Sequence, residues 1–133
     1  MKESLAAGLA CSRRVTVDRP RTIGFMGEDL RVYATPWVVS DAEYTCRDMI
    51  FDYLDAGEDS VGTHVEIDHL APTLLDMWAE VSVTVAAVEG RLVTFEFSVR
   101  DALEEVARGR HVRFVVDIAK TAERLAAKKA RIA

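Results

Sequence analysis

The sequence predicts an α+β domain in which one long central helix packs on one face of an antiparallel sheet. The segment 37–54 carries apolar residues at the spacing of an amphipathic helix. Four later segments alternate apolar and polar residues, as strands with one buried face do. The chain has 133 residues, half of them hydrophobic, which is enough for one domain with its own core. We therefore expect residues 1–133 to form a single domain, with 1–11 and 120–133 as peripheral termini.

The first half of the chain leads into the helix. Residues 11–18 (CSRRVTVD) fit a short first strand, and glycines and prolines interrupt the segment 19–36, which is predicted to be irregular. The helix is predicted over residues 37–54 (WVVSDAEYTCRDMIFDYL). It is expected to stop at Asp55-Ala56-Gly57, where Gly57 suits a left-handed backbone conformation.

The second half is predicted to be a meander of strands over residues 63–70, 79–88, 92–100 and 105–118. Glu89-Gly90 is a hairpin-turn signal between two of them. Gly109, inside the last strand, predicts a β-bulge. The tail from Ala119 onward is rich in Ala, Lys and Arg, which favours a helix.

Glu43 is the most informative residue of the predicted helix. It lies within the apolar stripe, four residues after Val39 and three before Cys46, whereas the other acids of the helix, Asp41 among them, fall mostly on the opposite, solvated face. A carboxylate that faces a core costs several kcal/mol unless it is paired, hydrogen-bonded or protonated. Two interpretations follow: Glu43 is a functional carboxylate, or it lies at the edge of the stripe and reaches water.

His69 and Thr35 are the other candidates for chemistry. His69 shares a strand face with Val65 and Ile67, so it should point toward the helix, and Thr35 comes just before the helix. If the strand packs near the helix, the hydroxyl, imidazole and carboxylate line one cleft, as in acyl-transfer sites. The alternatives are a hydrogen-bonded core histidine and an ordinary turn threonine. His64 and His111 are predicted to be surface or edge histidines.

The composition argues against several classes of protein. A net charge of −5 and a pI of about 5.2 give no indication of nucleic-acid binding. No apolar run approaches the roughly 18 residues of a membrane span. Cys11 and Cys46 are too few for a disulfide framework, Cys46 is expected to be a small core residue, and a reducing cytoplasm fits both. No cluster of His, Cys or carboxylates has the spacing of metal ligands, so no metal is expected.

Several strings of the sequence resemble the hotdog-fold thioesterases, in particular the fluoroacetyl-CoA thioesterase-like group. They are VYATPW, the helix that carries Glu43, LDAGEDSVGTHVEIDHLAPT and AAVEGRLVTFEFSV. The resemblance covers roughly residues 12–118. It implies the hotdog fold, in which an antiparallel sheet wraps a long central helix.

The resemblance also implies a function and a site. The family's catalytic Thr, Glu and His correspond to Thr35, Glu43 and His69 in this sequence. Arg113 matches an Arg near the site or the CoA, and Trp37 and Gly62 complete the substrate-binding candidates. The resemblance implies a coenzyme A thioester as substrate, no cofactor, and a homodimer with the site at the subunit interface.

The sequence therefore predicts an acyl-CoA thioesterase. Glu43 would act as a general base on water or as a nucleophile, and His69 would orient Glu43 or deprotonate the water. The segment 23–34 is short and differs from the family's apolar lid, so a fluorinated substrate is not carried over and the acyl group stays open. The alternatives are a non-catalytic acyl-CoA-binding hotdog protein and a hotdog dehydratase or hydratase.

Overall fold

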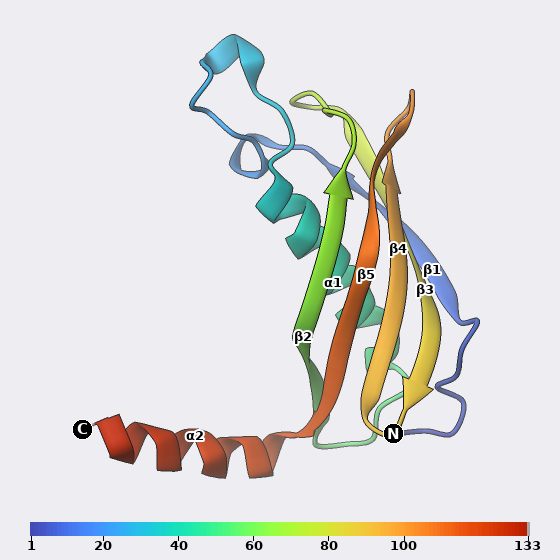
Figure 1. Cartoon of the computed structure of the whole chain (residues 1–133), viewed down its shortest axis with the longest axis vertical. Helices are drawn as coiled ribbons and strands as arrows, with labels where there is room; N and C mark the ends of the chain where they lie inside the picture. Colours follow the sequence, from blue (N-terminus) through green and yellow to red (C-terminus); the bar gives the residue numbers. More distant parts are fainter. Residues whose placement is uncertain (133) are drawn as a thin grey trace.

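A computed structural model describes residues 1–132 and confirms the predicted layers: one long helix packs on one face of a five-stranded antiparallel sheet (Figure 1). The sheet has the order β1-β3-β4-β5-β2, so β1 and β2 are its two edges. The elements are β1 (Ala10–Thr16), the 3₁₀ turns η1 (Arg19–Arg21) and η2 (Glu28–Leu30), α1 (Thr35–Phe51), β2 (Glu58–His69), β3 (Trp78–Glu89), β4 (Leu92–Arg100), β5 (Glu105–Asp117) and α2 (Ile118–Ile132).

Helix α1 begins two residues before the predicted start, because Pro36 occupies its first turn, where the missing N–H is not needed. Its buried stripe includes Val38, Ala42, Cys46 and Ile50, spaced four residues apart. Cys46 is a core residue, as predicted, and burial raises the pKa of its thiol to about 12. Glu43 lies beside this stripe, with its side chain 43% exposed.

Asp41 was predicted to be solvated, and this prediction is wrong. It is 5% exposed and accepts hydrogen bonds from the guanidinium of Arg21, at 2.9 and 3.0 Å, and from the Tyr33 hydroxyl. A buried carboxylate is tolerated when it is paired and hydrogen-bonded in this way. Asp41 therefore ties the irregular segment before the helix to α1.

The sheet follows the predicted strands, with two differences. Gly109 was predicted to mark a bulge, but it pairs in register with Ile67 on one side and Phe97 on the other. A glycine is required there because a Cβ would collide with the carbonyl oxygen of Glu66. β5 is irregular instead at Val106, since Val99 pairs with Ala107 and Arg100 pairs with Glu105, and β2 has a bulge between Gly62 and His64. The hairpin turn between β3 and β4 is as predicted, with Gly90 at φ 62°.

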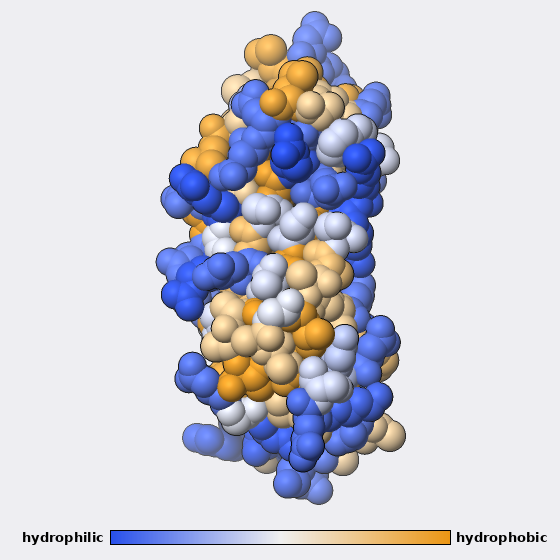
Figure 2. All heavy atoms as spheres, turned by 90° about the vertical axis from the view of Figure 1, so that its right-hand side faces the viewer, coloured by the Kyte–Doolittle hydropathy of each residue, from blue (hydrophilic) through white to orange (hydrophobic). Residues whose placement is uncertain are grey.

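Strand β2 begins five residues before the predicted start and is an edge strand over its whole length. Residues 61–66 of this strand are exposed. The other edge, β1, is covered by charged side chains: Arg13 pairs with Asp48 at 2.9 Å, and Arg14 pairs with Glu80 at 3.1 Å. Figure 2, which faces the β1 side, shows apolar groups over the lower middle of this face, bordered by hydrophilic groups, and further apolar groups near its top.

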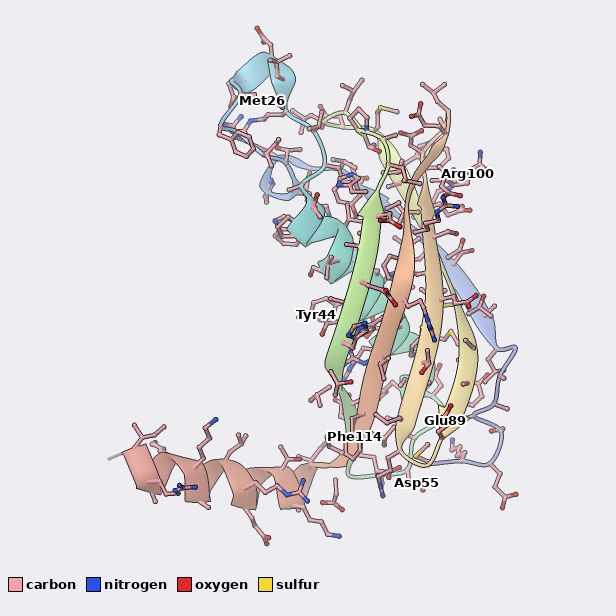
Figure 3. All side chains as sticks on the ribbon, in the orientation of Figure 1. Met26, Tyr44, Asp55, Glu89, Arg100 and Phe114 are labelled. Atoms are coloured by element: carbon pink, nitrogen blue, oxygen red, sulfur yellow. The ribbon has the colours of Figure 1, made fainter. Side chains whose placement is uncertain are left out.

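The molecule has two distinct ends along the strands. The upper end (residues 19–34, 70–77 and 101–104) carries Met26 and Arg100 in Figure 3, and the lower end (residues 52–57, 90–91 and the start of α2) carries Asp55 and Phe114. Helix α2 leaves the lower end and projects past β2, away from the rest of the chain (Figure 1). The tail is helical, as predicted, and has no buried residue.

Candidate active site

Thr35 and His69 are in direct contact. Thr35 is the first residue of α1 and His69 is the last residue of β2, and their Oγ1 and Nδ1 atoms are 2.6 Å apart. Burial lowers the pKa of His69, and a hydrogen bond with the Ala71 backbone opposes that shift. Its other ring nitrogen, Nε2, is shielded and has no hydrogen-bond partner among the described residues. The contact therefore orients a neutral imidazole whose Nε2 is shielded and, within residues 1–132, unpaired.

Glu43 belongs to a second group of residues. Its Oε1 accepts a hydrogen bond from Nη1 of Arg113 at 3.3 Å. Arg113 is 4% exposed and donates two further hydrogen bonds to Ser60, at 2.8 Å to the hydroxyl and 2.7 Å to the carbonyl. The guanidinium is thus fixed by the sheet, and it orients one carboxylate oxygen while the other is left free for chemistry.

His111 joins this group, although the sequence predicted a surface or edge position for it. The side chain is 2% exposed, and its Nδ1 lies 2.8 Å from the carbonyl oxygen of His64. Because a carbonyl only accepts, Nδ1 carries the proton and Nε2 is the acceptor for Arg113, 3.1 Å away. Burial lowers the pKa of His111, and the charge of Arg113 acts in the same direction. A neutral His111 therefore helps to hold Arg113 against Glu43.

The alternation of β5 could have revealed His111. Positions 107, 111, 113 and 115 of this strand are all buried, so His111 shares the inward face with Arg113. Arg113 was predicted only through the family resemblance. An inward-facing cation two residues from a histidine was the signal available, because a buried arginine needs several acceptors.

Gly62 brings the backbone of β2 against the Glu43 carboxylate. A Cβ at position 62 would lie 2.9 Å from Oε1 of Glu43 and 3.0 Å from Cε1 of His111. Glu43, Gly62 and His111 line a depression of about 230 Å³ together with residues 63–65. A second depression, of about 300 Å³, lies on the other side of Glu43 and is lined by Tyr44, Arg47 and Arg113, among others. Glu43 is thus accessible from both sides.

Within one chain the two groups stay apart. Thr35 and Glu43 are separated by eight residues of helix, or about 12 Å along its axis. Gly62 and His69 are separated by seven residues of strand, or roughly 23 Å. The structure therefore joins Thr35 to His69 and Glu43 to Arg113 and Gly62, and it shows no hydrogen bond between Glu43 and either member of the Thr35–His69 pair.

Trp37 lies in the first turn of α1, close in sequence to Thr35. Its ring is 39% exposed, and the guanidinium carbon of Arg21 lies 5.3 Å from the ring centroid. Arg21 in turn is held by Asp41, so the position of Trp37 depends on the same buried ion pair. The indole is therefore held against Arg21 at the start of α1, and no hydrogen bond or ring contact among the described residues joins it to the Thr35–His69 pair.

The part of the chain that the structure describes contains no group of three His, Cys, Asp or Glu residues placed to hold a metal ion. No helix within residues 1–132 is long and apolar enough to cross a membrane. A further surface depression, of about 560 Å³, lies over β2, β4 and β5 and is lined mainly by charged residues such as Glu66, Glu96 and Arg110. It contains none of the candidate site residues.

Comparison with known families decides the assignment of the chain. The model of the fluoroacetyl-CoA-specific thioesterase family matches residues 17–119, which include every candidate site residue. The chain belongs to this family. The match confirms the resemblance in the sequence, and the fold agrees with it.

Individual relatives and solved structures are also thioesterases or members of the thioesterase superfamily. The chain is 33% identical, over 89 residues, to the fluoroacetyl-CoA thioesterase of Streptantibioticus cattleyicolor, and the match spans 67% of this chain and 64% of that protein. A thioesterase superfamily member from Thermus thermophilus has a similar structure, with a TM-score of 0.86, 27% identity, and coverage of 94% of this chain and 93% of that one. A mutant of the fluoroacetyl-CoA-specific thioesterase FlK, solved in complex with fluoroacetate and CoA, has a TM-score of 0.81 at 27% identity and covers 88% of this chain and 99% of that chain.

Proposed function

We propose that the protein is an acyl-CoA thioesterase and that Glu43 is its central catalytic group. The observation that carries the proposal is a carboxylate held by a buried arginine at one oxygen and accessible at the other, within the residues that the family model matches. Such a carboxylate can remove a proton from water or attack a thioester carbonyl. The solved complex of a family member with fluoroacetate and CoA supports a CoA thioester as the substrate class.

Thioester hydrolysis requires little acid catalysis at the leaving group. Hydrolysis forms a C–O bond between water and the carbonyl carbon and breaks the C–S bond, and the thiolate is a stable leaving group. In one route Glu43 takes the proton of the attacking water. In the other, Glu43 attacks first and water then hydrolyses the resulting anhydride. Label in the Glu43 side chain after a single turnover in ¹⁸O-labelled water would establish the second route, because water that attacks the Glu43 carbonyl of the anhydride leaves its oxygen there.

We further propose that a homodimer completes the site. β2 is an exposed edge strand, and an antiparallel pair between two copies of β2 would satisfy its free backbone groups. If the two-fold axis passes near Val65 and Glu66, the bulge at Gly62 lies opposite the partner's His69. Neighbouring strands are about 4.8 Å apart, so the partner's Thr35–His69 pair would then stand beside Glu43.

Two features favour this edge for the dimer. The exposed part of β2, residues 61–66, lies largely within residues 62–69, the stretch that the pairing would cover. The opposite edge, β1, is protected by the ion pairs of Arg13 and Arg14, and charged side chains are a common defence of an edge against pairing. The separation of the two groups within one chain supports the same arrangement, because each group lacks the other.

In the dimer each residue has a definite role. Glu43 is the base or nucleophile, Arg113 and His111 position it, and the partner's His69 handles the proton of the water or of the leaving thiol. Thr35 orients the imidazole through its hydroxyl. The acyl group is left open, and fluoroacetyl-CoA is one substrate to be tested. Because CoA thioesters are metabolites of the cytoplasm, we place the enzyme there.

The experiment is thiol release from a panel of acyl-CoAs that includes acetyl-CoA and fluoroacetyl-CoA. The wild-type protein is compared with Glu43→Gln, which keeps the shape of the side chain and removes its charge. We expect turnover that falls by at least about a hundredfold in the variant. Binding of CoA thioesters without turnover by the wild type would instead favour a non-catalytic acyl-CoA-binding protein.

A further inference from the structure

Helix α2 is the element of the fold that the proposed function does not use. It contains 15 residues, none of them buried, and it extends past the β2 edge (Figures 1 and 3). An isolated helix of this length is marginally stable in water, so it requires a surface to pack on. The following argument rests on the proposed homodimer.

The sequence of α2 has a strongly amphipathic pattern. Ile118, Leu125 and Ile132 recur every seven residues on one face and are 51%, 61% and 78% exposed. The helix carries five basic residues and one acid, Glu123, for a net charge of +4. Because the whole chain has a net charge of −5, the remaining residues carry −9. The helix is therefore a basic, partly apolar element attached to an acidic body.

The upper end of the molecule has the complementary surface. It exposes large apolar side chains, namely Phe25 (84%), Met26 (49%), Leu30 (56%), Leu70 (49%), Leu74 (57%) and Leu103 (79%). Exposed acids lie among them, namely Asp29, Asp76 and Glu104, beside Glu28, which is paired with Arg19 and Arg31. Apolar patches of this kind, rimmed by charge, mark interaction surfaces.

One chain cannot bring these two surfaces together, because α2 starts at the lower end and the apolar loops lie at the upper end (Figure 3). An antiparallel pair of β2 strands reverses the partner, so the partner's upper end lies beside the lower end of the first subunit. Asp117, which precedes α2, pairs with Glu58 of β2. With the axis near Val65 and Glu66, Glu58 lies close to the partner's loop 70–77.

We propose that α2 of each subunit packs across the interface on the upper end of its partner. The apolar stripe of Ile118, Leu125 and Ile132 covers exposed leucines of the partner's loops, and the basic face meets the acids around them. Since the partner's loop 70–77 directly follows its His69, the helix also closes one side of the shared site. The occupant is a second copy of this chain.

The first test compares two substitutions in full-length protein. Leu125→Glu places a charge in the apolar stripe, whereas Ala127→Glu places the same charge on the opposite face, two residues and about 200° further round the helix. Both positions are exposed in the single chain, so neither variant should fail to fold. We expect sedimentation velocity to show a dimer dissociation constant raised by about tenfold or more for Leu125→Glu and by less than about twofold for Ala127→Glu. Equal constants for wild type and both variants would overturn the proposal.

The second test locates the helix directly. A photo-crosslinking amino acid replaces Leu125 in isotopically light chains, which are mixed with heavy wild-type chains before irradiation. We expect light-to-heavy crosslinks to residues 23–30, 70–77 or 101–104. Crosslinks within one chain only, or binding of the helix to phosphatidylserine vesicles in place of the partner, would contradict the proposal. If the enzyme is an active dimer in which α2 is free, only this inference is refuted. If the active enzyme is a monomer, the proposed dimer is refuted as well.

Discussion

The Glu43 group and the Thr35–His69 pair differ in how completely the chain holds them. Glu43 is fixed by Arg113, which is itself held by Ser60 and His111, so its surroundings are rigid and mostly buried. The Thr35–His69 pair is joined by one hydrogen bond, and Nε2 of His69 lacks a hydrogen-bond partner among the described residues. The difference indicates that a single chain fully positions the carboxylate of Glu43 but leaves the imidazole of His69 without a partner for proton transfer.

The largest loss of activity should come from removing the imidazole of His69. We expect His69→Ala to lower kcat for thioester hydrolysis by about a hundredfold or more, because a positioned acid–base group contributes that much. Thiol release measures it. His64→Ala is the matched control, since His64 lies on the same strand and its side chain is 57% exposed. A loss of equal size in the control would remove the special role of His69.

Gly62→Ala should disturb the carboxylate side of the site. The added methyl group would lie 2.9 Å from Oε1 of Glu43, so the carboxylate must move away from β2. We expect kcat to fall by about tenfold, in line with small errors in the position of a catalytic group. Steady-state kinetics measures this, with Thr63→Ala as the neighbouring control. Unchanged kinetics would show that Glu43 does not need its contact with the strand.

Thr35→Ala should have a smaller effect. The hydroxyl orients the imidazole and does not supply the proton-transfer group, so a several-fold loss in kcat is expected, of the order of one hydrogen bond. Thr35→Ser keeps the hydroxyl and should restore most of the activity. If the serine variant were as impaired as the alanine variant, the role of the hydrogen bond would be refuted.

The smallest effect concerns the pH dependence of stability. His111 has a pKa lowered by burial, so the unfolded chain takes up a proton before the folded chain does. Its contribution is fully present above the ordinary histidine pKa of about 6.5 and is lost as the pH falls below that value. Urea unfolding at pH 7 and pH 5 should show a smaller drop in the free energy of unfolding for His111→Gln than for the wild type. An equal drop in both proteins would exclude His111 as a source of that pH dependence.

Much of the fold could be predicted from the sequence, because periodicity reports directly on buried faces. The helix at 37–54 and the four later strands were found in this way, with boundaries off by a few residues. The periodicity of the sequence does not show which side chains from other segments contact a given residue. Asp41 was placed on the solvated face because nothing local shows that Arg21 and Tyr33 reach it.

The candidate site was predictable only in part. Thr35 and His69 lie in contact, as their positions at the ends of two adjacent elements suggested. His111 was missed because a lone histidine in a charged stretch looks exposed until the alternation of β5 is followed. The separation of Glu43 from His69 depends on where along β2 each contact falls, and the bulge at Gly62 shifts that register. Because Gly62 lies just outside the predicted strand 63–70, no bulge was predicted there.

Subunit complementation tests the shared site most directly. Glu43→Ala and His69→Ala homodimers, each inactive, are dissociated, mixed in equal amounts and reassembled. If the site combines Glu43 of one subunit with His69 of the other, each mixed dimer holds one intact site, and activity should recover to about a quarter of the wild-type value, since random pairing makes half of the dimers mixed. If both residues act within one chain, no site is intact in any dimer. A mixture that exchanges subunits and stays inactive would therefore contradict the account.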